Sequence, residues 1–389
     1  MRALDGITVV ALEHAVAAPY CTRQLADLGA RVIKIERPGS GDFARRYDDR
    51  VRGLSSYFVW ANRSKESLTL DVKHAEAPKI LRALTERADV LVQNLAPGAA
   101  KRLGLDYATL STSHPKLIVC DISGYGDEGP YAQRKAYDLL VQSESGFLSV
   151  NGTPEQPAKS GPPVADISAA TAATTNILAA LIERRRTGRG KRIEIAMLDS
   201  MLEWMGYPLY YAFDGAPLPP RTGAAHATIY PYGAFGAANG ESVMLGIQNE
   251  REWTKFCADA LGKPELATDL RFDSNAKRSA NRAELDRVIA PIFGELSAAQ
   301  LRERLDAAGI ANAQVNDMHA VWKHPQLAAR GRWSEVDTPV GKVPALNPPG
   351  ASEARMDAVP RVGEHTNAIL SELGYDATTI DRLRAAGTI

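Results

Sequence analysis

The sequence has few cysteines and no excess of charge of either sign. Its three cysteines, Cys21, Cys120 and Cys257, lie far apart in 389 residues and show no zinc or redox spacing. This pattern favours a reducing compartment, so we expect a cytoplasmic protein without a bound metal. Lys plus Arg and Asp plus Glu both number 46. Without net positive charge, nucleic acid is not expected as a partner.

Long apolar runs are also scarce. The apolar stretch at 7–12 is shorter than the core of a signal peptide, and no run approaches the length of a membrane span. We therefore expect no membrane partner. His319 and His324 have no cysteine or carboxylate cluster beside them, so they do not indicate a metal site.

What the sequence does contain is an alternation of apolar strands and helices. The pattern predicts strands at 7–12, 31–36, 90–93 and 117–122, with helices at 20–28 and 75–87. Such an alternation is typical of an α/β fold, in which helices cover a parallel sheet.

A nicotinamide or flavin site is one reading of this pattern. Glu36 ends the second strand, where a dinucleotide-binding protein places its ribose-binding acid. However, residues 13–23 contain no glycine, so the phosphate-binding turn is missing. The sequence therefore argues against a dinucleotide.

The composition changes after residue 212, where proline, glycine and tyrosine become frequent. A helical region follows at 250–308, with Trp253, Phe256, Leu261, Phe272 and Phe293 as its expected core. We expect a large domain at 1–212, a small domain with linkers at 213–325, and a C-terminal part at 326–389 that ends in a helix at 365–373.

The segment 162–190 places a carboxylate at a helix start. Asp166 and Ser168 precede an alanine-rich run that ends at Gly188, and an alternating strand follows at 193–197. The pattern predicts that Asp166 is the N-cap of this helix. Most acids in such a position are only caps.

This segment resembles that of the class III coenzyme A-transferases, the CaiB/BaiF-like superfamily of formyl-CoA and carnitine CoA-transferases, and the resemblance spans nearly the whole chain. It implies that Asp166 is the nucleophile. It also implies a Rossmann-like large domain built from the N- and C-terminal parts, a smaller α+β domain, and two chains interlocked as rings in a homodimer. No cofactor would be bound permanently, because acyl-CoA and a small carboxylate are the substrates.

The resemblance also implies a set of residues that bind coenzyme A. The phosphates of CoA need cations, and its long arm needs backbone that it can approach. The positions that match the family are Val16, Arg37, Leu70, Lys73, Asn94, Gly98, Ala99, Arg102, Lys135 and Tyr137.

The family's chemistry carries over as a set of expectations. Asp166 would attack the thioester, giving an aspartyl anhydride and then an aspartyl-CoA thioester, so no ATP is needed. Both acid groups of a dicarboxylate acceptor would be ionised at working pH, so their pKa values add nothing to the choice of acceptor. Ala169 and Ala170 stand where many relatives have glycine, and Val16 replaces the glutamine of formyl-CoA transferase. The latter argues against formyl-CoA and oxalate.

For the acceptor, Arg45, Arg46, Arg221 and His226 lie in segments expected to border the site, and the stretch at 223–233 resembles members acting on C4–C5 dicarboxylates. We expect a succinyl-CoA or mesaconyl-CoA type donor.

Two alternatives remain open. An α-methylacyl-CoA racemase would keep Asp166 but needs a second base, a histidine in a Gly-His-Asp pattern, where this chain has Ala136, Tyr137 and Asp138. A catalytically idle CoA-binding protein is the other alternative.

Overall fold

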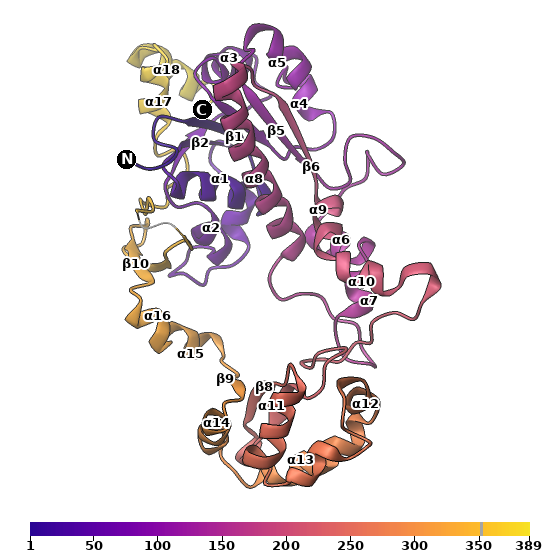
Figure 1. Cartoon of the computed structure of the whole chain (residues 1–389). Helices are drawn as coiled ribbons and strands as arrows, with labels where there is room; N and C mark the ends of the chain where they lie inside the picture. Colours follow the sequence, from indigo (N-terminus) through magenta and orange to yellow (C-terminus); the bar gives the residue numbers. More distant parts are fainter. Residues whose placement is uncertain (351–352) are drawn as a thin grey trace. The chain divides into compact units, whose positions relative to one another are not determined.

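The computed structural model describes residues 1–350 and 353–389, which divide into two compact units (Figure 1). The first unit contains Met1–Gly146, Ser160–Gly206 and Gln326–Ile389. The second contains Phe147–Lys159 and Tyr207–Pro325. The segment Phe147–Lys159 thus groups with the second unit, although the sequence suggested that it belonged with residues 1–212.

A six-stranded parallel sheet forms the centre of the first unit, and the predicted α/β fold is confirmed. Its strand order is β3-β2-β1-β4-β5-β6. The strands are β1 (Thr8–Leu12), β2 (Arg31–Glu36), β3 (Lys65–Thr69), β4 (Val90–Gln93), β5 (Ile118–Ser123) and β6 (Arg192–Ala196). The order reverses between β1 and β4, and open α/β sheets bind ligands at the carboxyl edge beside such a reversal.

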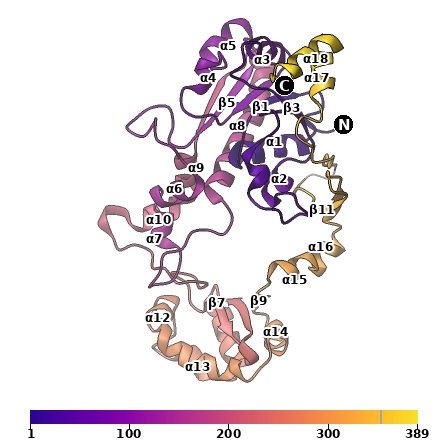
Figure 2. The same ribbon diagram turned by 180° about the vertical axis from the view of Figure 1, so that it is seen from behind.

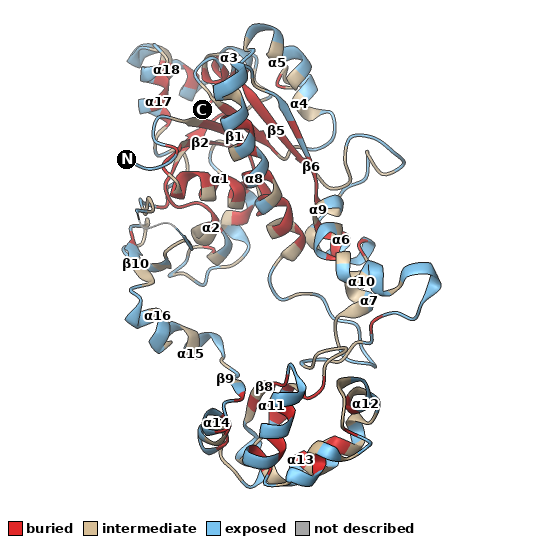
Figure 3. Ribbon diagram, viewed as in Figure 1, coloured by how far each residue is buried: buried red, intermediate tan, exposed pale blue. Residues whose placement is uncertain are grey.

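Helices cover both faces of the sheet (Figure 2). Along β1, Val10 and Leu12 face one side, where they join an apolar core with α3 (Ala77–Glu86), α5 (Tyr107–Ser113), α17 (Thr366–Glu372) and α18 (Ala377–Ala385). The other face is covered by α1 (Ala17–Asp27) and α8 (Val164–Thr187). The inner strands β1 and β4 are therefore buried on both sides (Figure 3), which explains why they are continuous apolar runs. The edge strand β6 instead keeps the predicted alternation, with Arg192 and Glu194 exposed.

Helix α8 differs from the sequence prediction in two ways. Its N-cap is Pro163, so Asp166 occupies the third helical position and the prediction of an Asp166 N-cap was wrong. Among the described helices it is also long and apolar enough to span a membrane, contrary to expectation, but half of its most apolar window is buried. Because it packs against α1, β5 and β6, its burial is that of a core helix.

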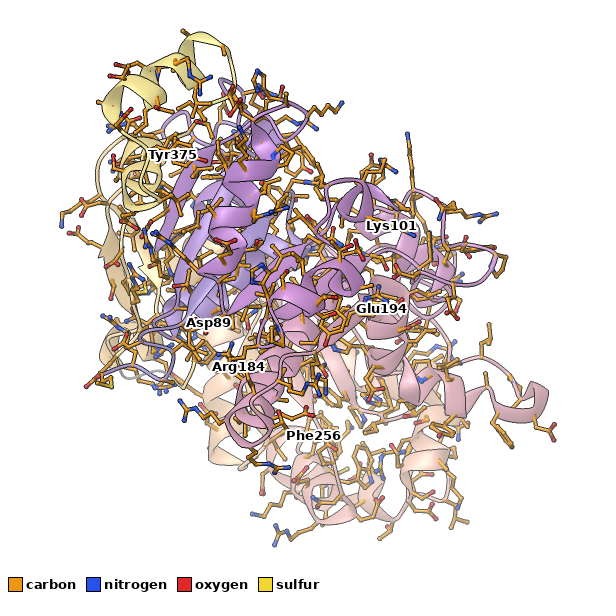
Figure 4. The ribbon with its side chains drawn as sticks, turned by 90° about the horizontal axis from the view of Figure 1, so that it is seen from above. Asp89, Lys101, Arg184, Glu194, Phe256 and Tyr375 are labelled. Atoms are coloured by element: carbon orange, nitrogen blue, oxygen red, sulfur yellow. The ribbon has the colours of Figure 1, made fainter. Side chains whose placement is uncertain are left out.

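The C-terminal end of α8 is fixed to the amino ends of strands β1 and β4. The Arg184 guanidinium lies 2.9 Å from Oδ1 of Asp89, and Oδ2 of Asp89 accepts the backbone N–H of Thr8 at 2.9 Å (Figure 4). Arg184 is thus a structural anchor in a basic stretch that the sequence left as a solvated connection. Strand β6 ends at Ala196, one residue before the predicted end, because Met197 begins α9 (Met197–Trp204).

The C-terminal residues complete the edge of the sheet beside β3. The hydroxyl of Thr366 accepts the Thr69 N–H at 2.9 Å, and the His365 N–H donates to the Ser67 carbonyl at 3.0 Å. The remaining elements of the first unit are η1 (Phe43–Arg46), α2 (Ser56–Ala61), α4 (Ala99–Arg102), α6 (Asp138–Glu144) and the hairpin of β10 (Trp333–Val336) and β11 (Val343–Leu346).

The second unit has its own core around an antiparallel sheet of β7 (Tyr232–Gly236), β8 (Ser242–Gly246) and β9 (Ala311–Gln314). All five aromatic and leucine residues predicted as its core are buried. Its helices are α7 (Phe147–Val150), α11 (Glu250–Lys255), α12 (Asn275–Ala280), α13 (Arg282–Gly294), α14 (Ala298–Ala307) and α15 (Met318–Trp322), with short turns at η2 (Phe213–Gly215), η3 (Ala238–Gly240), η4 (Phe256–Ala260) and η5 (Pro264–Thr268). Helices α10 (Gly206–Tyr211) and α16 (Pro325–Ala329) lie where the chain passes between units.

Candidate active site

Asp166 lies where the starts of two helices meet. It occupies the first turn of α8, is partly buried, and accepts a hydrogen bond from the backbone N–H of Ala17. Ala17 is the first residue of α1, whose N-cap is Val16. The free N–H groups and the dipole at a helix N-terminus favour an anionic partner, so α1 stabilises negative charge on Asp166.

The cap of α8 comes from Asp138, which lies on α6. Its Oδ1 accepts the N–H groups of Ala165 and Asp166 at 2.9 and 3.4 Å, and its Oδ2 accepts Nε2 of the buried Gln142 at 2.6 Å. Rules for N-caps consider only residues next to the helix start, so this distant cap could not be predicted from the sequence. It leaves the Asp166 carboxylate free of a capping role.

The carboxylates of Asp138 and Asp166 therefore both lie at the start of α8. Burial and the negative charge of Asp138 raise the pKa of Asp166 to about 7, while the Ala17 N–H opposes the shift. Asp166 is therefore only partly ionised near neutral pH. Its carboxylate is accordingly more basic than an ordinary aspartate, and basicity favours nucleophilic attack.

The turn from β1 to α1 is held by side chains from other strand connections. Asn94, which follows β4, accepts the His14 N–H at 3.0 Å and donates to the His14 carbonyl at 2.9 Å. Asp42 accepts the Ala15 N–H at 3.2 Å. Ala15 itself has φ 64°, a left-handed conformation that costs a non-glycine residue about 1–2 kcal/mol.

A buried ionic cluster stabilises this turn through Glu13 and Asp42. The Glu13 carboxylate accepts from Lys65 Nζ at 2.7 Å and lies 3.4 Å from Lys34 Nζ, which in turn lies 2.8 Å from Oδ2 of Asp42. All four side chains are fully buried. Opposite charges of this kind must stay paired, because removing one partner leaves an uncompensated buried charge. A charged residue inside the apolar run 31–36 was the signal in the sequence for this cluster.

Glu36 and two arginines considered for the acceptor have structural partners. Glu36, the acid that suggested a ribose site, pairs with Arg45 at 2.7 Å and accepts the Ser67 hydroxyl at 2.6 Å. Arg221 donates to the carbonyls of Thr153 and Pro154 at 2.9 and 2.8 Å. Arg45 is thus paired with a carboxylate, and two of the nitrogens of Arg221 already donate to backbone carbonyls.

Four predicted CoA-binding cations lie in the connections that begin at the carboxyl edge of the sheet. Each lies in the connection that leaves a different strand: Lys73 after β3, Arg37 after β2, Arg102 after β4 and Lys135 after β5. All four are exposed, and none forms a salt bridge among residues 1–350 and 353–389. In the strand order of the sheet they flank β1 on both sides. Unpaired cations so arranged are suited to a ligand with several phosphates.

The other predicted CoA-binding residues differ in what they can offer. The side chains of Val16 and Leu70 are buried in the core, so only their backbone can meet a ligand. Gly98 has φ 73° as the N-cap of α4, and a side chain there would lie 3.1 Å from Arg102, which explains the glycine. Ala99 follows it as the partly exposed first residue of α4.

Two exposed tyrosines lie near the carboxylates of the site, Tyr47 within electrostatic reach of Asp166 and Tyr137 next to Asp138 in the sequence. Burial, followed by the charges of Asp42, Asp166 and Tyr137, raises the pKa of Tyr47 to about 12, which places these groups within electrostatic reach of one another. The exposed Tyr137 precedes α6. Arg46, predicted for the acceptor, is exposed next to Tyr47 and forms no salt bridge in the described chain. Tyr47 was not predicted from the sequence, because no motif marks it.

Residues 4–366 match the sequence profile described as CoA-transferase family III. The chain belongs to this family.

Its similarity to individual proteins extends over nearly their whole length. It is 32% identical over 400 residues to the human succinyl-CoA:glutarate CoA-transferase, covering 100% of this chain and 90% of that protein. It is 33% identical over 397 residues to the succinyl-CoA:mesaconate CoA-transferase of Haloarcula hispanica, with 97% and 98% covered. A CAIB/BAIF family protein from Brucella suis has the same fold, with a TM-score of 0.84, 34% identity, and 96% and 99% of the two chains covered.

As a member of family III, the protein is an enzyme that transfers coenzyme A. Its remaining predicted substrate residue, His226, lies in the second unit. Nδ1 of His226 accepts the N–H groups of Thr228 and Ile229 at 3.1 and 3.0 Å, so the neutral ring carries its proton on Nε2. The ring also stacks on Tyr232, with centroids 5.2 Å apart. The Nε2–H group of His226 is therefore the ring group available as a hydrogen-bond donor.

No group of three metal-binding side chains occurs among the described residues of this transferase.

The raised pKa of Asp166 predicts a titration that depends on Asp138. In this transferase Asp166 should be neutral below and ionised above pH about 7. Asp138→Asn keeps an oxygen to cap α8 but removes the neighbouring charge, so it should move the midpoint to lower pH. Infrared difference spectroscopy would follow the protonated carboxyl band, assigned by its loss in Asp166→Asn. Asp106→Asn, at the cap of α5, is the matched control and should change nothing. An unmoved midpoint in Asp138→Asn would contradict the electrostatic cause.

Proposed function

We propose that the protein transfers coenzyme A from a succinyl-CoA or mesaconyl-CoA type donor to a C4–C5 dicarboxylate, with Asp166 as the nucleophile. The observation that carries the proposal is the Asp166 carboxylate, kept basic by Asp138 and held by the Ala17 N–H. The substrates named for the human and Haloarcula relatives, which are glutarate and mesaconate, support a dicarboxylate acceptor.

The first step uses the charge on Asp166. One carboxylate oxygen attacks the thioester carbonyl carbon, a C–O bond forms, the C–S bond breaks, and CoA leaves as the thiolate. The product is a mixed anhydride of Asp166 and the donor acid. This step removes the negative charge from beside Asp138, so the repulsion that raises the pKa of Asp166 is relieved as the reaction proceeds.

The second step uses the Ala17 N–H. The thiolate attacks the Asp166 carbonyl carbon, and the donor carboxylate leaves as the aspartyl-CoA thioester forms. The oxygen that keeps the Ala17 hydrogen bond carries the developing negative charge, so this N–H serves as an oxyanion donor. The acceptor carboxylate then takes the place of the donor, and the same two steps run in reverse. Each intermediate conserves the activation of the thioester, so no ATP is consumed.

Coenzyme A enters as a substrate along the carboxyl edge of the sheet. Lys73, Arg37, Arg102 and Lys135 are the cations available to its phosphates. Asn94 and the backbone at Gly98 lie at the same edge, at the reversal of strand order. A cation without an internal ion-pair partner should bind a phosphate more strongly, because no existing ion pair has to be broken first.

Replacing the nucleophile tests the proposed function. Asp166→Ala should lower the rate of CoA transfer from succinyl-CoA to glutarate by about 10³-fold or more, while CoA still binds, because the cations do not depend on this residue. Steady-state kinetics and calorimetry with CoA measure the two effects. Asp376→Ala, at the exposed cap of α18, is the control and should retain full activity.

Two results would contradict this function. Persistent transfer in Asp166→Ala would exclude a covalent route through this residue. Exchange of solvent deuterium at the α-carbon of a 2-methylacyl-CoA, without transfer, would instead indicate the racemase.

The acceptor preference tests the role of Arg46. Glutarate and valerate have equal chain length, so only the second carboxylate distinguishes them. We expect kcat/KM for glutarate to exceed that for valerate by about ten- to a hundredfold, the size of one charged hydrogen bond. Arg46→Met should narrow the ratio and Arg46→Lys should retain part of it. Oxalate should be a poor acceptor. Equal rates with valerate would refute the dicarboxylate assignment.

We also propose a homodimer. Large apolar side chains are exposed close together in the sequence around α10, and an exposed apolar surface of this kind commonly marks an interface. They are Trp204, Tyr207, Leu209, Tyr210, Tyr211, Phe213 and Leu218. Light scattering should give twice the 42.0-kDa mass of one chain, and Tyr210→Glu with Phe213→Glu should reduce it. A single-chain mass for the unmodified protein would exclude the dimer.

A further inference from the structure

The turn at 13–16 is held at each of its first three residues by side chains from other segments of the first unit. The Glu13 carboxylate is fixed by Lys65 and by the hydroxyl of Thr22, at 2.7 and 2.6 Å. Asn94 forms hydrogen bonds with both the N–H and the carbonyl of His14. Asp42 accepts the N–H of Ala15. The backbone then passes through Val16 to the Ala17 N–H that contacts Asp166.

The turn would not keep this shape without such support. Ala15 has a positive φ, which residues other than glycine rarely adopt unless their surroundings impose it. Its neighbours His14 and Val16 have side chains too, so no glycine in the turn relieves the strain. A backbone held in a strained conformation at a reacting group is a common feature of active sites.

We propose that Asn94 and Asp42 are positioning residues, which hold the strained turn at 13–16 so that the Ala17 N–H stays aimed at Asp166. This inference rests on the proposed role of Asp166. It assigns Asn94 a task different from the CoA contact that the resemblance implies. It also explains why Asp42 lies in the buried cluster: its Oδ2 faces Lys34 at 2.8 Å while its Oδ1 accepts the N–H groups of Ala15 and Ala44.

The kinetics of Asn94→Ala distinguish the two roles of Asn94. If the turn loosens, the Ala17 N–H is lost to the transition state, and kcat should fall about ten- to a hundredfold with KM for succinyl-CoA unchanged. A residue that only contacts CoA would raise KM and leave kcat intact. The matched control is Asn347→Ala, which also removes two side-chain hydrogen bonds, in the hairpin of β10 and β11.

The pH profile supplies a readout that loss of stability would not move. The Ala17 N–H lowers the pKa of Asp166, so Asn94→Ala should shift the acidic limb of kcat/KM to higher pH. The titratable groups that face Asp166 are Asp138 and Tyr47, and neither is altered by this change. The control should keep the limb of the unmodified enzyme.

Asp42 gives an independent test through a conservative pair. Asp42→Ala and Asp42→Asn both remove the charge that faces Lys34, so they share the loss of stability that comes from this charge. Only Asp42→Asn keeps an oxygen for the Ala15 N–H, and it should recover at least about tenfold in kcat over Asp42→Ala.

Three results would overturn the positioning role. They are a rise in KM alone in Asn94→Ala, a fall in its kcat without a shift of the acidic limb, or equal rates in the two Asp42 variants. Transfer that persists in Asp166→Ala would instead refute the proposed function, so the two failures are distinguishable.

Discussion

The hydrogen bond from the Ala17 N–H to the Asp166 carboxylate connects the two halves of the site. One partner opens α1 at the reversal of strand order, and the other lies in the first turn of α8. Its opposing influence is the charge of Asp138, which caps α8 and keeps Asp166 basic. The Ala17 N–H stabilises the ionised form of Asp166, so the carboxylate can form near neutral pH. The charge of Asp138 disfavours the ionised form, so the carboxylate remains basic enough to attack a thioester.

The surrounding fold serves this pair of contacts. The parallel sheet brings the connections after β2, β3, β4 and β5 to one edge, and each supplies an exposed cation without a salt bridge in the described chain. Two of these connections, those after β2 and β4, also supply Asp42 and Asn94, which fix the turn before α1. In these two loops a change should affect both ligand binding and the nucleophile.

Strands β1, β2, β4 and β5 were predictable because burial makes them largely apolar runs, whereas β3, with only Leu68 as a large apolar residue, was not predicted. Residues 31–36 and 90–93 form strands with the predicted bounds. Asp166 was found through its resemblance to a family, but its environment was not, because the capping Asp138 and the clamp Asn94 act over 27 and 80 residues of sequence. A match to a family motif, or a position near the site, does not show whether a side chain is free to bind a ligand. Leu70 matched the motif but is buried, and Arg45 lies in a segment near the site but is paired with Glu36.

The most direct test of the account is to trap the covalent intermediate. The protein would be mixed with succinyl-CoA, quenched with hydroxylamine, digested and analysed by mass spectrometry. We expect a hydroxamate on Asp166 and none on Asp138, because only Asp166 is not engaged in capping α8. An unmodified Asp166 in a protein that is turning over would contradict it.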